Sequence, residues 1–297
     1  MCEGDDLMIK MIVTDMDGTL LNRDKGLTPY TIDMLKRAIN AGIRFVVATG
    51  RDWSGIQPIF KDTGIVYSAI LGNGAQYANE QGEITKTAYF NKERFKEVTK
   101  IFDDHDIHYM IFTHDGYYST HEPEDVCEGF IQRGSRRFGR PYEEIKASYK
   151  KNPAPCTQLV KINDVDAWLE EPHQIIKIEA FDKDETKVIE AKKYLPPIKN
   201  IAHLSSFVDN VEVTDESAQK GLILEKVIAD LGIAHDEVAV FGDGLNDITL
   251  FQLFEESYAM QNGQQEIKDL AKYIAPDCND DGVGKMVEKI LRQQGIL

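Results

Sequence analysis

The residues best suited to chemistry in this sequence are paired aspartates, and the first pair is Asp15 and Asp17 in the segment DMDGT. They follow an apolar segment, 7–14, which predicts a strand buried on both faces of a parallel sheet. Two carboxylates about 4 Å apart repel each other by on the order of 4 kcal/mol unless a proton or cation joins them. An EF-hand loop needs Gly at its sixth position and Glu at its twelfth, where this chain has Leu20 and Gly26. A solvated turn or acidic helix cap is the alternative for this pair alone.

A second acidic pair, Asp243 and Asp247 in the segment GDGLND, follows a predicted strand at 237–241 and opens a predicted helix. By itself this segment is an ordinary glycine turn. Ligands of open parallel sheets bind beyond the carboxyl ends of the strands, so we expect both pairs at one sheet edge. Together they would form an oxygen-rich site for a hard cation. Mg²⁺ fits best, because it is usually held by one or two carboxylates together with water and phosphate.

Two further segments carry groups that bind anions. Thr49, Gly50 and Arg51 follow another predicted strand, where the Thr hydroxyl and nearby backbone N–H groups could bind a phosphate, although such turns are common without one. Lys220 lies near the start of a helix predicted over 217–231, where its charge opposes the helix dipole. A solvated surface lysine is the alternative. The functional interpretation is a cation that holds a phosphoryl group.

The elements that must position these residues show two different patterns of hydrophobicity along the chain. At both ends, buried strands alternate with amphipathic helices, which predicts right-handed βαβ units and a Rossmann-like parallel sheet. In the middle, polar helices alternate with half-polar strands, which are typical of a mixed or antiparallel sheet. We therefore expect an α/β core at 1–82 and 209–297, with an α+β cap domain inserted at 83–208.

Composition narrows the class of protein. Of the 297 residues, 42% are hydrophobic and 28% are charged, which is near the globular average. A formal net charge of −16 argues against a general nucleic-acid-binding protein, which needs a basic face. The sequence contains no apolar run of the roughly 20 residues that cross a bilayer, and its start, MCEGDD, lacks the pattern of a signal peptide. We expect a cytoplasmic monomer or homodimer that binds neither nucleic acid nor membrane.

Taken jointly and in this order, DxDGT, TGR, a Lys at a helix start and GDxxND resemble the haloacid dehalogenase-like superfamily. The large insertion resembles the superfamily's Cof-type sugar-phosphatase branch. The resemblance covers essentially the whole chain. The sequence departs from the family pattern at Gln261-Asn262-Gly263, where Gly-Asn-Ala is frequent, and in the acidic segment before Lys220.

The resemblance implies an Mg²⁺-dependent phosphatase that acts on a small-molecule phosphate ester, with sugar phosphates as the first expectation. Asp15 would be the nucleophile, and Asp17 would be the general acid and base, with a pKa above the usual carboxyl range. Asp15, the backbone carbonyl of Asp17, and Asp243 would bind Mg²⁺. Asp247 would be a further ligand or would position a bound water.

The same resemblance implies roles for the anion-binding segments. Thr49, Gly50, Arg51 and Lys220 would hold the phosphoryl oxygens, and Asn246 would form a hydrogen bond inside the site. A phosphomutase acting on hexose phosphates and a weakly catalytic phospho-ligand sensor are the alternatives. The mutase would return the phosphoryl group to a sugar, whereas the sensor would bind its ligand without appreciable turnover.

Overall fold

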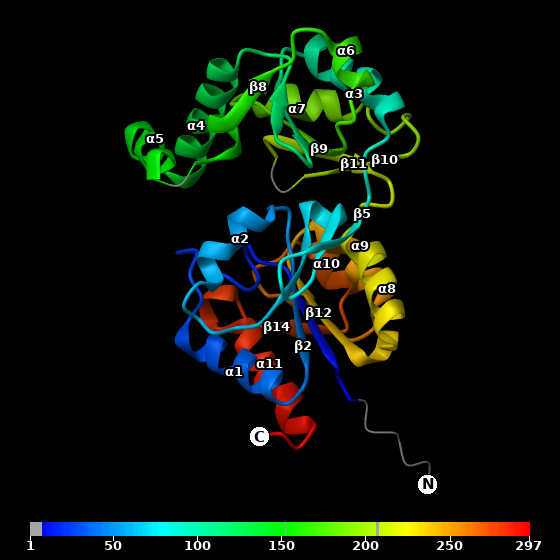
Figure 1. Cartoon of the computed structure of the whole chain (residues 1–297). Helices are drawn as coiled ribbons and strands as arrows, with labels where there is room; N and C mark the ends of the chain where they lie inside the picture. The colour runs from blue at the N-terminus through cyan, green and yellow to red at the C-terminus, as the bar shows by residue number, and fades with distance from the viewer. Residues whose placement is uncertain (1–7, 152, 206–207) are drawn as a thin grey trace. The chain divides into compact units, whose positions relative to one another are not determined.

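A computed structural model describes residues 8–151, 153–205 and 208–297 (Figure 1). The chain forms two compact units. The first is built from the chain up to Thr87 and from Ser217 onwards, and the second runs from Ala88 to Glu216. These boundaries fall a few residues beyond the expected ranges of 1–82, 83–208 and 209–297, because one strand lies on the far side of each expected boundary from its sheet. β5 (Ile84–Thr87) pairs within the sheet of the first unit, and β11 (Asn210–Asp215) pairs within that of the second.

The first unit contains an eight-stranded sheet in the order β14-β13-β12-β1-β2-β3-β4-β5. Its strands from β14 to β3 pair in parallel, and β4 and β5 add an antiparallel edge. This arrangement confirms the expected α/β fold with a parallel core. The remaining strand bounds are β1 (Met11–Thr14), β2 (Arg44–Ala48), β3 (Ser68–Leu71), β4 (Gln76–Ala78), β12 (Val238–Gly242), β13 (Ser257–Met260) and β14 (Tyr273–Ala275).

Helices cover both faces of this sheet, which is why its central strands are apolar at nearly every position. Ile12 of β1 belongs to a hydrophobic cluster with side chains of α1, α2 and α11, whereas Met11 and Val13 belong to a cluster with side chains of α8, α9 and α10. Figure 1 shows α1 and α11 on one side of the sheet and α8 on the other. The helix bounds are α1 (Pro29–Asn40), α2 (Trp53–Phe60), α8 (Lys220–Leu231), α9 (Ile248–Leu253), α10 (Gln265–Leu270) and α11 (Gly282–Gln293).

Local sequence explains where these elements begin. The Thr28 side chain accepts a hydrogen bond from the Thr31 N–H and caps α1, with proline in its first turn, as the sequence predicts. The helix expected from 217 begins only at Lys220, because Gln219 is extended, with φ −131° and ψ 142°. Of the strand expected over 7–14, the ladder of β1 covers the last four residues. Leu7 and the segment MCEGDD lie outside the described residues.

The second unit has a six-stranded sheet in the order β10-β11-β9-β6-β7-β8, antiparallel except for the β7–β8 pair. One face of the sheet packs against α3, α6 and α7, and the other packs against α4. The part of the chain that the structure describes contains no helix long and apolar enough to cross a bilayer. The bounds are β6 (His108–Thr113), β7 (Tyr117–Ser119), β8 (Leu159–Lys161), β9 (Ile175–Phe181), β10 (Ile201–Leu204), α3 (Phe95–Asp104), α4 (Pro123–Phe138), α5 (Tyr142–Lys151), α6 (Val165–Glu170) and α7 (Glu185–Lys192).

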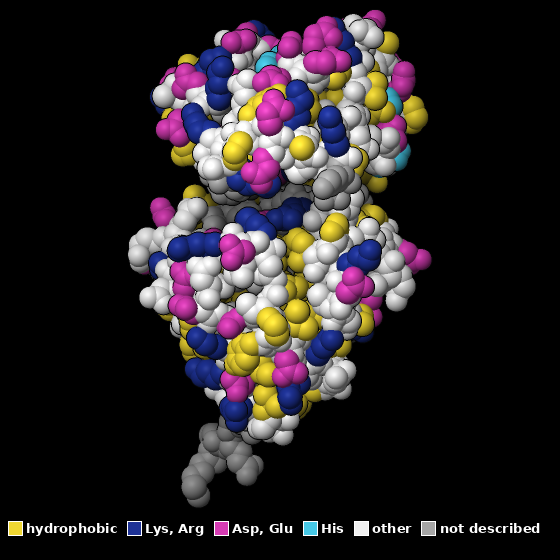
Figure 2. Space-filling model, turned by 90° about the vertical axis from the view of Figure 1, so that its left-hand side faces the viewer, with side chains coloured by type: hydrophobic (Ala, Val, Ile, Leu, Met, Phe, Trp, Pro, Cys, Tyr) yellow, Lys and Arg dark blue, Asp and Glu magenta, His cyan; other side chains and the backbone are white. Residues whose placement is uncertain are grey.

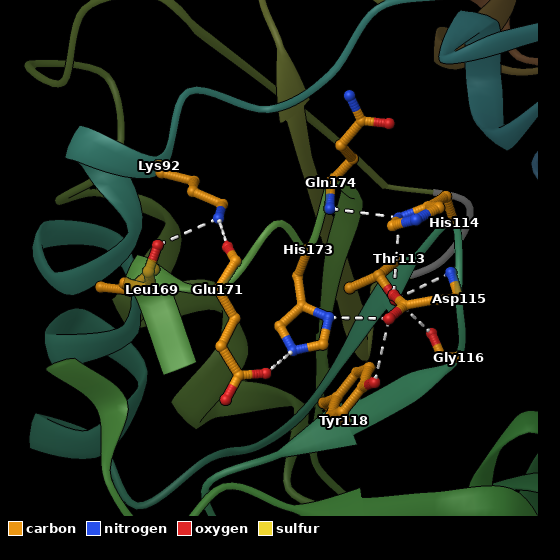
Figure 3. Close-up of polar contacts among 10 residues, drawn as sticks. All are labelled: Lys92, Thr113, His114, Asp115, Gly116, Tyr118, Leu169, Glu171, His173 and Gln174. Atoms are coloured by element: carbon orange, nitrogen blue, oxygen red, sulfur yellow. Dashed lines mark hydrogen bonds and ion pairs between the residues drawn. The ribbon is translucent and has the colours of Figure 1, made fainter. Parts of the chain in front are cut away.

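A histidine joins two loops at one end of the second unit's sheet (Figure 3). His173, which precedes β9, places Nδ1 2.8 Å from Asp115 Oδ2 in the β6–β7 turn and Nε2 2.9 Å from Glu171 Oε2 after α6. Its ring also stacks on Trp168 of α6 at 4.8 Å between centroids. These contacts give His173 a structural role within this unit.

Candidate active site

The site lies in the first unit, at the carboxyl ends of neighbouring parallel strands. Asp15 follows β1, and its backbone N–H donates to the carbonyl of Phe241 in β12 at 2.9 Å. Asp243 follows β12, the strand that pairs with β1. Thr49 follows β2 on the other side of β1, and its N–H donates to the Ile70 carbonyl of β3 at 2.8 Å. The topology therefore brings residues about 200 positions apart to one edge, as the sequence predicts.

Three aspartates and a lysine form the centre of the site. Asp15, Asp243 and Asp247 each offer a carboxylate oxygen, and these oxygens lie within 4.8 Å of one another. The Lys220 Nζ donates to Asp15 Oδ1 and to Asp247 Oδ1, both at 2.6 Å, and the lysine is fully buried. The alternative of a solvated surface lysine is therefore wrong.

Glycines and backbone N–H groups hold this cluster in place. Asp247 Oδ2 accepts hydrogen bonds from the N–H groups of Asp243 at 3.0 Å and Gly244 at 3.1 Å. A Cβ on Gly242 would lie 2.6 Å from the Asp247 carboxylate, and a Cβ on Gly18, whose φ is +92°, would lie 2.5 Å from Asp243 Oδ2. Both positions therefore require glycine, which explains these two glycines of the DMDGT and GDGLND segments.

The electrostatics of the cluster fit a divalent cation. Burial raises the pKa of Asp15 well above its ordinary value, and burial together with the Asp247 charge raises the pKa of Asp243 to about 6. Burial opposes the charge of Lys220, but the two carboxylates outweigh it and raise the lysine pKa. Three carboxylates and one ammonium carry a net charge of −2, which one divalent ion would neutralise. The three aspartates would bind a metal ion through oxygen atoms, which suits a hard cation such as Mg²⁺.

Asp17 lies apart from this cluster, in a cluster of ion pairs. Arg51 donates to it through Nε at 2.9 Å and Nη2 at 2.8 Å, and the Lys25 Nζ donates to its Oδ1 at 2.5 Å. Burial alone would raise the pKa of Asp17, but the hydrogen bonds and charges of Arg51 and Lys25 outweigh it and lower the pKa below its ordinary value. The expected raised pKa is therefore wrong for the chain in this state.

The turn after β2 is held by Asn73, a residue outside the set of candidates that the sequence suggests. The N–H of Asn73, after β3, donates to the Thr49 carbonyl at 2.9 Å, and its side-chain Oδ1 accepts from Asn246 Nδ2 at 3.1 Å. Asn73 is fully buried and has φ +58°, a conformation that asparagine tolerates better than most residues. It links the segments of Thr49, Gly50 and Asn246, since a Cβ on Gly50 would lie 3.1 Å from its amide. In the sequence, the Asn73-Gly74 pair after β3 indicates a turn, and this is the local pattern from which the role of Asn73 could have been suspected.

Asn262 supports the same edge despite the unusual residues around it. Its Nδ2 donates to the Gly18 carbonyl at 2.7 Å, and its Oδ1 accepts from the N–H of Cys278 at 2.9 Å. The departure from Gly-Asn-Ala therefore leaves the asparagine contact with the DMDGT loop intact.

A parallel sheet covered by helices on both faces, with an acidic cluster at its carboxyl edge, defines an α/β protein of Rossmann-like topology. A family model for haloacid dehalogenase-like hydrolases matches residues 12–287, and this chain belongs to that family. The same match confirms the resemblance to the Cof-type branch. Similar proteins are named phosphatases, which is consistent with a phosphoric monoester hydrolase.

Among these similar proteins, Phosphatase YwpJ of Bacillus subtilis is 25% identical over 95% of this chain and 100% of its own length. The 5-amino-6-(5-phospho-D-ribitylamino)uracil phosphatase YwtE of the same organism is 24% identical over 96% of this chain and 99% of its own. A solved haloacid dehalogenase-like hydrolase from Bacillus subtilis shares the fold, with a TM-score of 0.80 at 24% identity over 94% of this chain and 99% of that one.

Proposed function

We propose that this chain is an Mg²⁺-dependent phosphatase that hydrolyses small phosphorylated metabolites, sugar phosphates first, through an aspartyl-phosphate intermediate. One observation carries the proposal: in a member of a hydrolase family, three mutually close aspartates and one buried lysine occupy the carboxyl edge of the parallel sheet. Phosphoryl transfer needs positive charge around the phosphoryl oxygens, which Lys220 and a divalent cation held by the aspartates would supply.

Four aspartates would hold the metal. Asp15 and Asp243 would bind it directly, with the backbone carbonyl of Asp17, and Asp247 would bind it or position a water. When bound, the cation would offset the charge on the phosphoryl oxygens and help to orient the phosphate. The carboxylates that would accept the cation are the ones whose burial and mutual repulsion raise the pKa of Asp15 and Asp243.

Two aspartates would carry out the covalent steps. A carboxylate oxygen of Asp15 attacks phosphorus while the bond from phosphorus to the ester oxygen breaks, and Asp17 gives a proton to that oxygen. In the second step Asp17 accepts a proton from the water that attacks phosphorus, which releases Asp15. Lys220, 2.6 Å from Asp15, offsets the repulsion between the carboxylate and the phosphate. The ion pairs that lower the pKa of Asp17 suit the base of the second step, and they oppose the protonated form that the first step requires.

The remaining predicted residues would bind the phosphoryl group. Thr49, Gly50 and Arg51 follow β2, and Lys220 begins α8. Asn246 would form a hydrogen bond within the site, where it already donates to Asn73. The name of one relative, which refers to a phosphorylated ribityl compound, supports a small phosphorylated metabolite as the substrate class.

A cytoplasmic location, and assembly as a monomer or homodimer without nucleic acid or membrane partners, remain proposals. The net charge of −16 supports the absence of a nucleic-acid partner, whose binding needs a basic face. Figure 2 adds that Lys and Arg side chains are interspersed with Asp and Glu on the viewed face of each unit, rather than gathered on a basic face.

The test is Mg²⁺-dependent phosphate release from p-nitrophenyl phosphate and from a panel of sugar phosphates. We expect turnover that chelation with EDTA abolishes, and loss of at least about a thousandfold in Asp15→Asn, because the nucleophile is gone. Asp33→Asn is the matched control, since Asp33 lies on α1 and pairs with Arg37. Unchanged turnover in Asp15→Asn would contradict the proposal. Net isomerisation of a hexose phosphate would instead identify a mutase, and tight binding without turnover would identify a sensor.

A further inference from the structure

Two cations from separate loops converge on one carboxylate, that of Asp17, two residues after Asp15 in the chain. Arg51 forms a two-point contact with Asp17 through Nε and Nη2, and Lys25 contacts the same carboxylate through Nζ. A third contact, from Arg51 Nη1 to the Gly55 carbonyl at 3.3 Å, orients the guanidinium. The three charged groups sum to +1 in a chain whose net charge is −16.

These groups are open to solvent, unlike the centre of the site. The side chains of Asp17, Arg51 and Lys25 are 31%, 32% and 45% exposed, whereas those of Lys220 and Asp15 are 0% and 8% exposed. A guanidinium has five N–H donors and an ammonium has three. Each cation therefore keeps N–H groups beyond those that Asp17 accepts, and a ligand in solution can reach them.

The backbone of Lys25 indicates that the position of its side chain matters. Lys25 has φ +61°, a conformation that glycine and asparagine adopt much more easily than lysine. The turn itself is held by Asn22, whose side-chain oxygen accepts from the Gly26 N–H at 2.9 Å and whose carbonyl accepts from the Lys25 N–H. The turn does not need a lysine, so the ammonium is the feature that this residue adds.

The place of Asp17 in the proposed reaction says what the two cations would meet. In that reaction Asp17 exchanges a proton with the leaving-group oxygen, so cations bonded to Asp17 would lie on the leaving-group side of the phosphate. Lys220 contacts Asp15 and Asp247, on the side of the phosphoryl group. We propose that Lys25 and Arg51 form a subsite for a second anionic group of the substrate, so that the Arg51 guanidinium, which is bonded to Asp17, binds that group rather than the phosphoryl oxygens. The preferred substrates are then phosphate monoesters whose leaving group carries a carboxylate or another phosphate close to the ester oxygen. This inference rests on the proposed function and specifies its substrate class.

The test compares substrates that differ only in the second anion. The carboxylate arm is 2-phosphoglycerate against glycerol 2-phosphate, and the phosphate arm is glycerol 1,2-bisphosphate against glycerol 2-phosphate, all with saturating Mg²⁺. In at least one pair, we expect the wild-type kcat/KM to be roughly five- to tenfold higher for the ester that carries the second anion, as partly exposed charge pairs allow. The arm with the larger ratio identifies the anion.

Substitutions in the loop that carries Lys25 distinguish the effect of a charge at the subsite from that of a charge elsewhere in the same loop. Lys25→Asn tolerates the same backbone conformation and should lower the ratio to roughly two- to threefold, because Arg51 remains, whereas Lys25→Arg should keep most of the original ratio. Arg23→Gln is the control, because Arg23 lies in the same loop, is 79% exposed and approaches Asp277 only at 4.0 Å. A preference unchanged in Lys25→Asn, or an equal loss for both members of each pair, would overturn the subsite.

A binding measurement keeps this inference separate from the proposed chemistry. The Asp15→Asn protein, loaded with Mg²⁺, is titrated with 2-phosphoglycerate and glycerol 2-phosphate in a calorimeter, with and without the Lys25→Asn change. A Kd ratio of roughly five- to tenfold that Lys25→Asn lowers to roughly two- to threefold supports the subsite even if the wild type hydrolyses neither ester. Equal Kd values for the two ligands overturn it even if the wild type proves to be a phosphatase.

Discussion

At the scale of single residues, the loops around the site are joined by an uncharged residue, Asn73. Asn73 joins the Thr49 turn to Asn246 and does so from a left-handed backbone conformation in a fully buried position. Its role therefore has two separable parts. The backbone conformation lets the chain turn after β3, and the amide accepts the hydrogen bond from Asn246.

Two substitutions at this position separate those parts. Asn73→Gly keeps the backbone conformation and removes the amide, whereas Asn73→Ala removes the amide and also strains the backbone. We expect Asn73→Ala to lower the free energy of unfolding by about 1 kcal/mol more than Asn73→Gly, because alanine disfavours positive φ. Both should lower kcat/KM by a similar factor, since both leave Asn246 without its acceptor. Urea unfolding and steady-state kinetics measure the two quantities, and equal stabilities would contradict the backbone role of Asn73.

Residue types in this sequence reveal much of the site, but not the partners of each side chain. The aspartates, Thr49 and Lys220 could be selected because their types and spacing fit phosphate and metal chemistry. The partner of Asn246 lies 173 positions away, so no local pattern connects the two amides. Likewise, the contacts of Lys25 and Arg51 with Asp17 depend on loop conformations, and without them the sign of the Asp17 pKa shift could not be predicted.

At the scale of elements, the loop after β3 determines where α8 begins. Gly74, with φ +107°, lies so close to the backbone of Gln219 that a Cβ would fall 2.3 Å from the Gln219 carbonyl carbon. Gln219 is the extended residue that precedes Lys220. Hydrophobic periodicity predicts the helix but not this contact, which is why the start expected from the sequence, at 217, lies too early in the chain.

Adding a methyl group at Gly74 should therefore impair both stability and catalysis. Gly74→Ala must move the Gln219 backbone, and with it Lys220, so we expect a loss of more than about 3 kcal/mol in unfolding free energy and about a hundredfold or more in kcat. Gly232→Ala is the matched control: Gly232 ends α8 with φ +65°, and among the described residues nothing beyond its own helix and chain neighbours lies within 4 Å of the position that its new methyl group would take. That variant should cost only about 1 kcal/mol and keep near-wild-type kcat. Circular dichroism and unfolding curves for both proteins check this, and similar losses in the two would refute the importance of the Gly74–Gln219 contact.

At the scale of the whole molecule, each unit has a sheet and a hydrophobic core of its own, and the first is assembled from both ends of the chain. The change from buried strands to half-polar strands predicts such an insertion. It could not locate the boundaries to the residue, because β5 and β11 are recognised as members of a sheet only through their pairing partners. All of the aspartates proposed to bind metal lie in the first unit, whose stability should therefore respond to the cation.

The metal-free protein should be more stable in mild acid than at neutral pH. Asp243 has a pKa of about 6 in the folded chain, above its ordinary value of 3.8, because burial and Asp247 disfavour its ionisation. The folded state therefore binds this proton more tightly than the unfolded state does, and its contribution to stability is lost as pH rises through about 6. The raised pKa of Asp15 acts in the same direction.

Binding of Mg²⁺ should reverse this trend, since the cation replaces protons at the same carboxylates. We expect roughly 5 mM MgCl₂ to raise the Tm of the first unfolding transition more at about pH 7.5 than at about pH 5.5, measured by scanning calorimetry. The added salt also screens a chain of net charge −16, so NaCl of equal ionic strength must be the reference. Asp243→Asn should lose most of the Mg²⁺-specific shift and, without metal, be more stable than wild type at the higher pH, because one repelling carboxylate is gone. If Mg²⁺ and NaCl raise Tm equally at both pH values, the aspartates do not form a metal site.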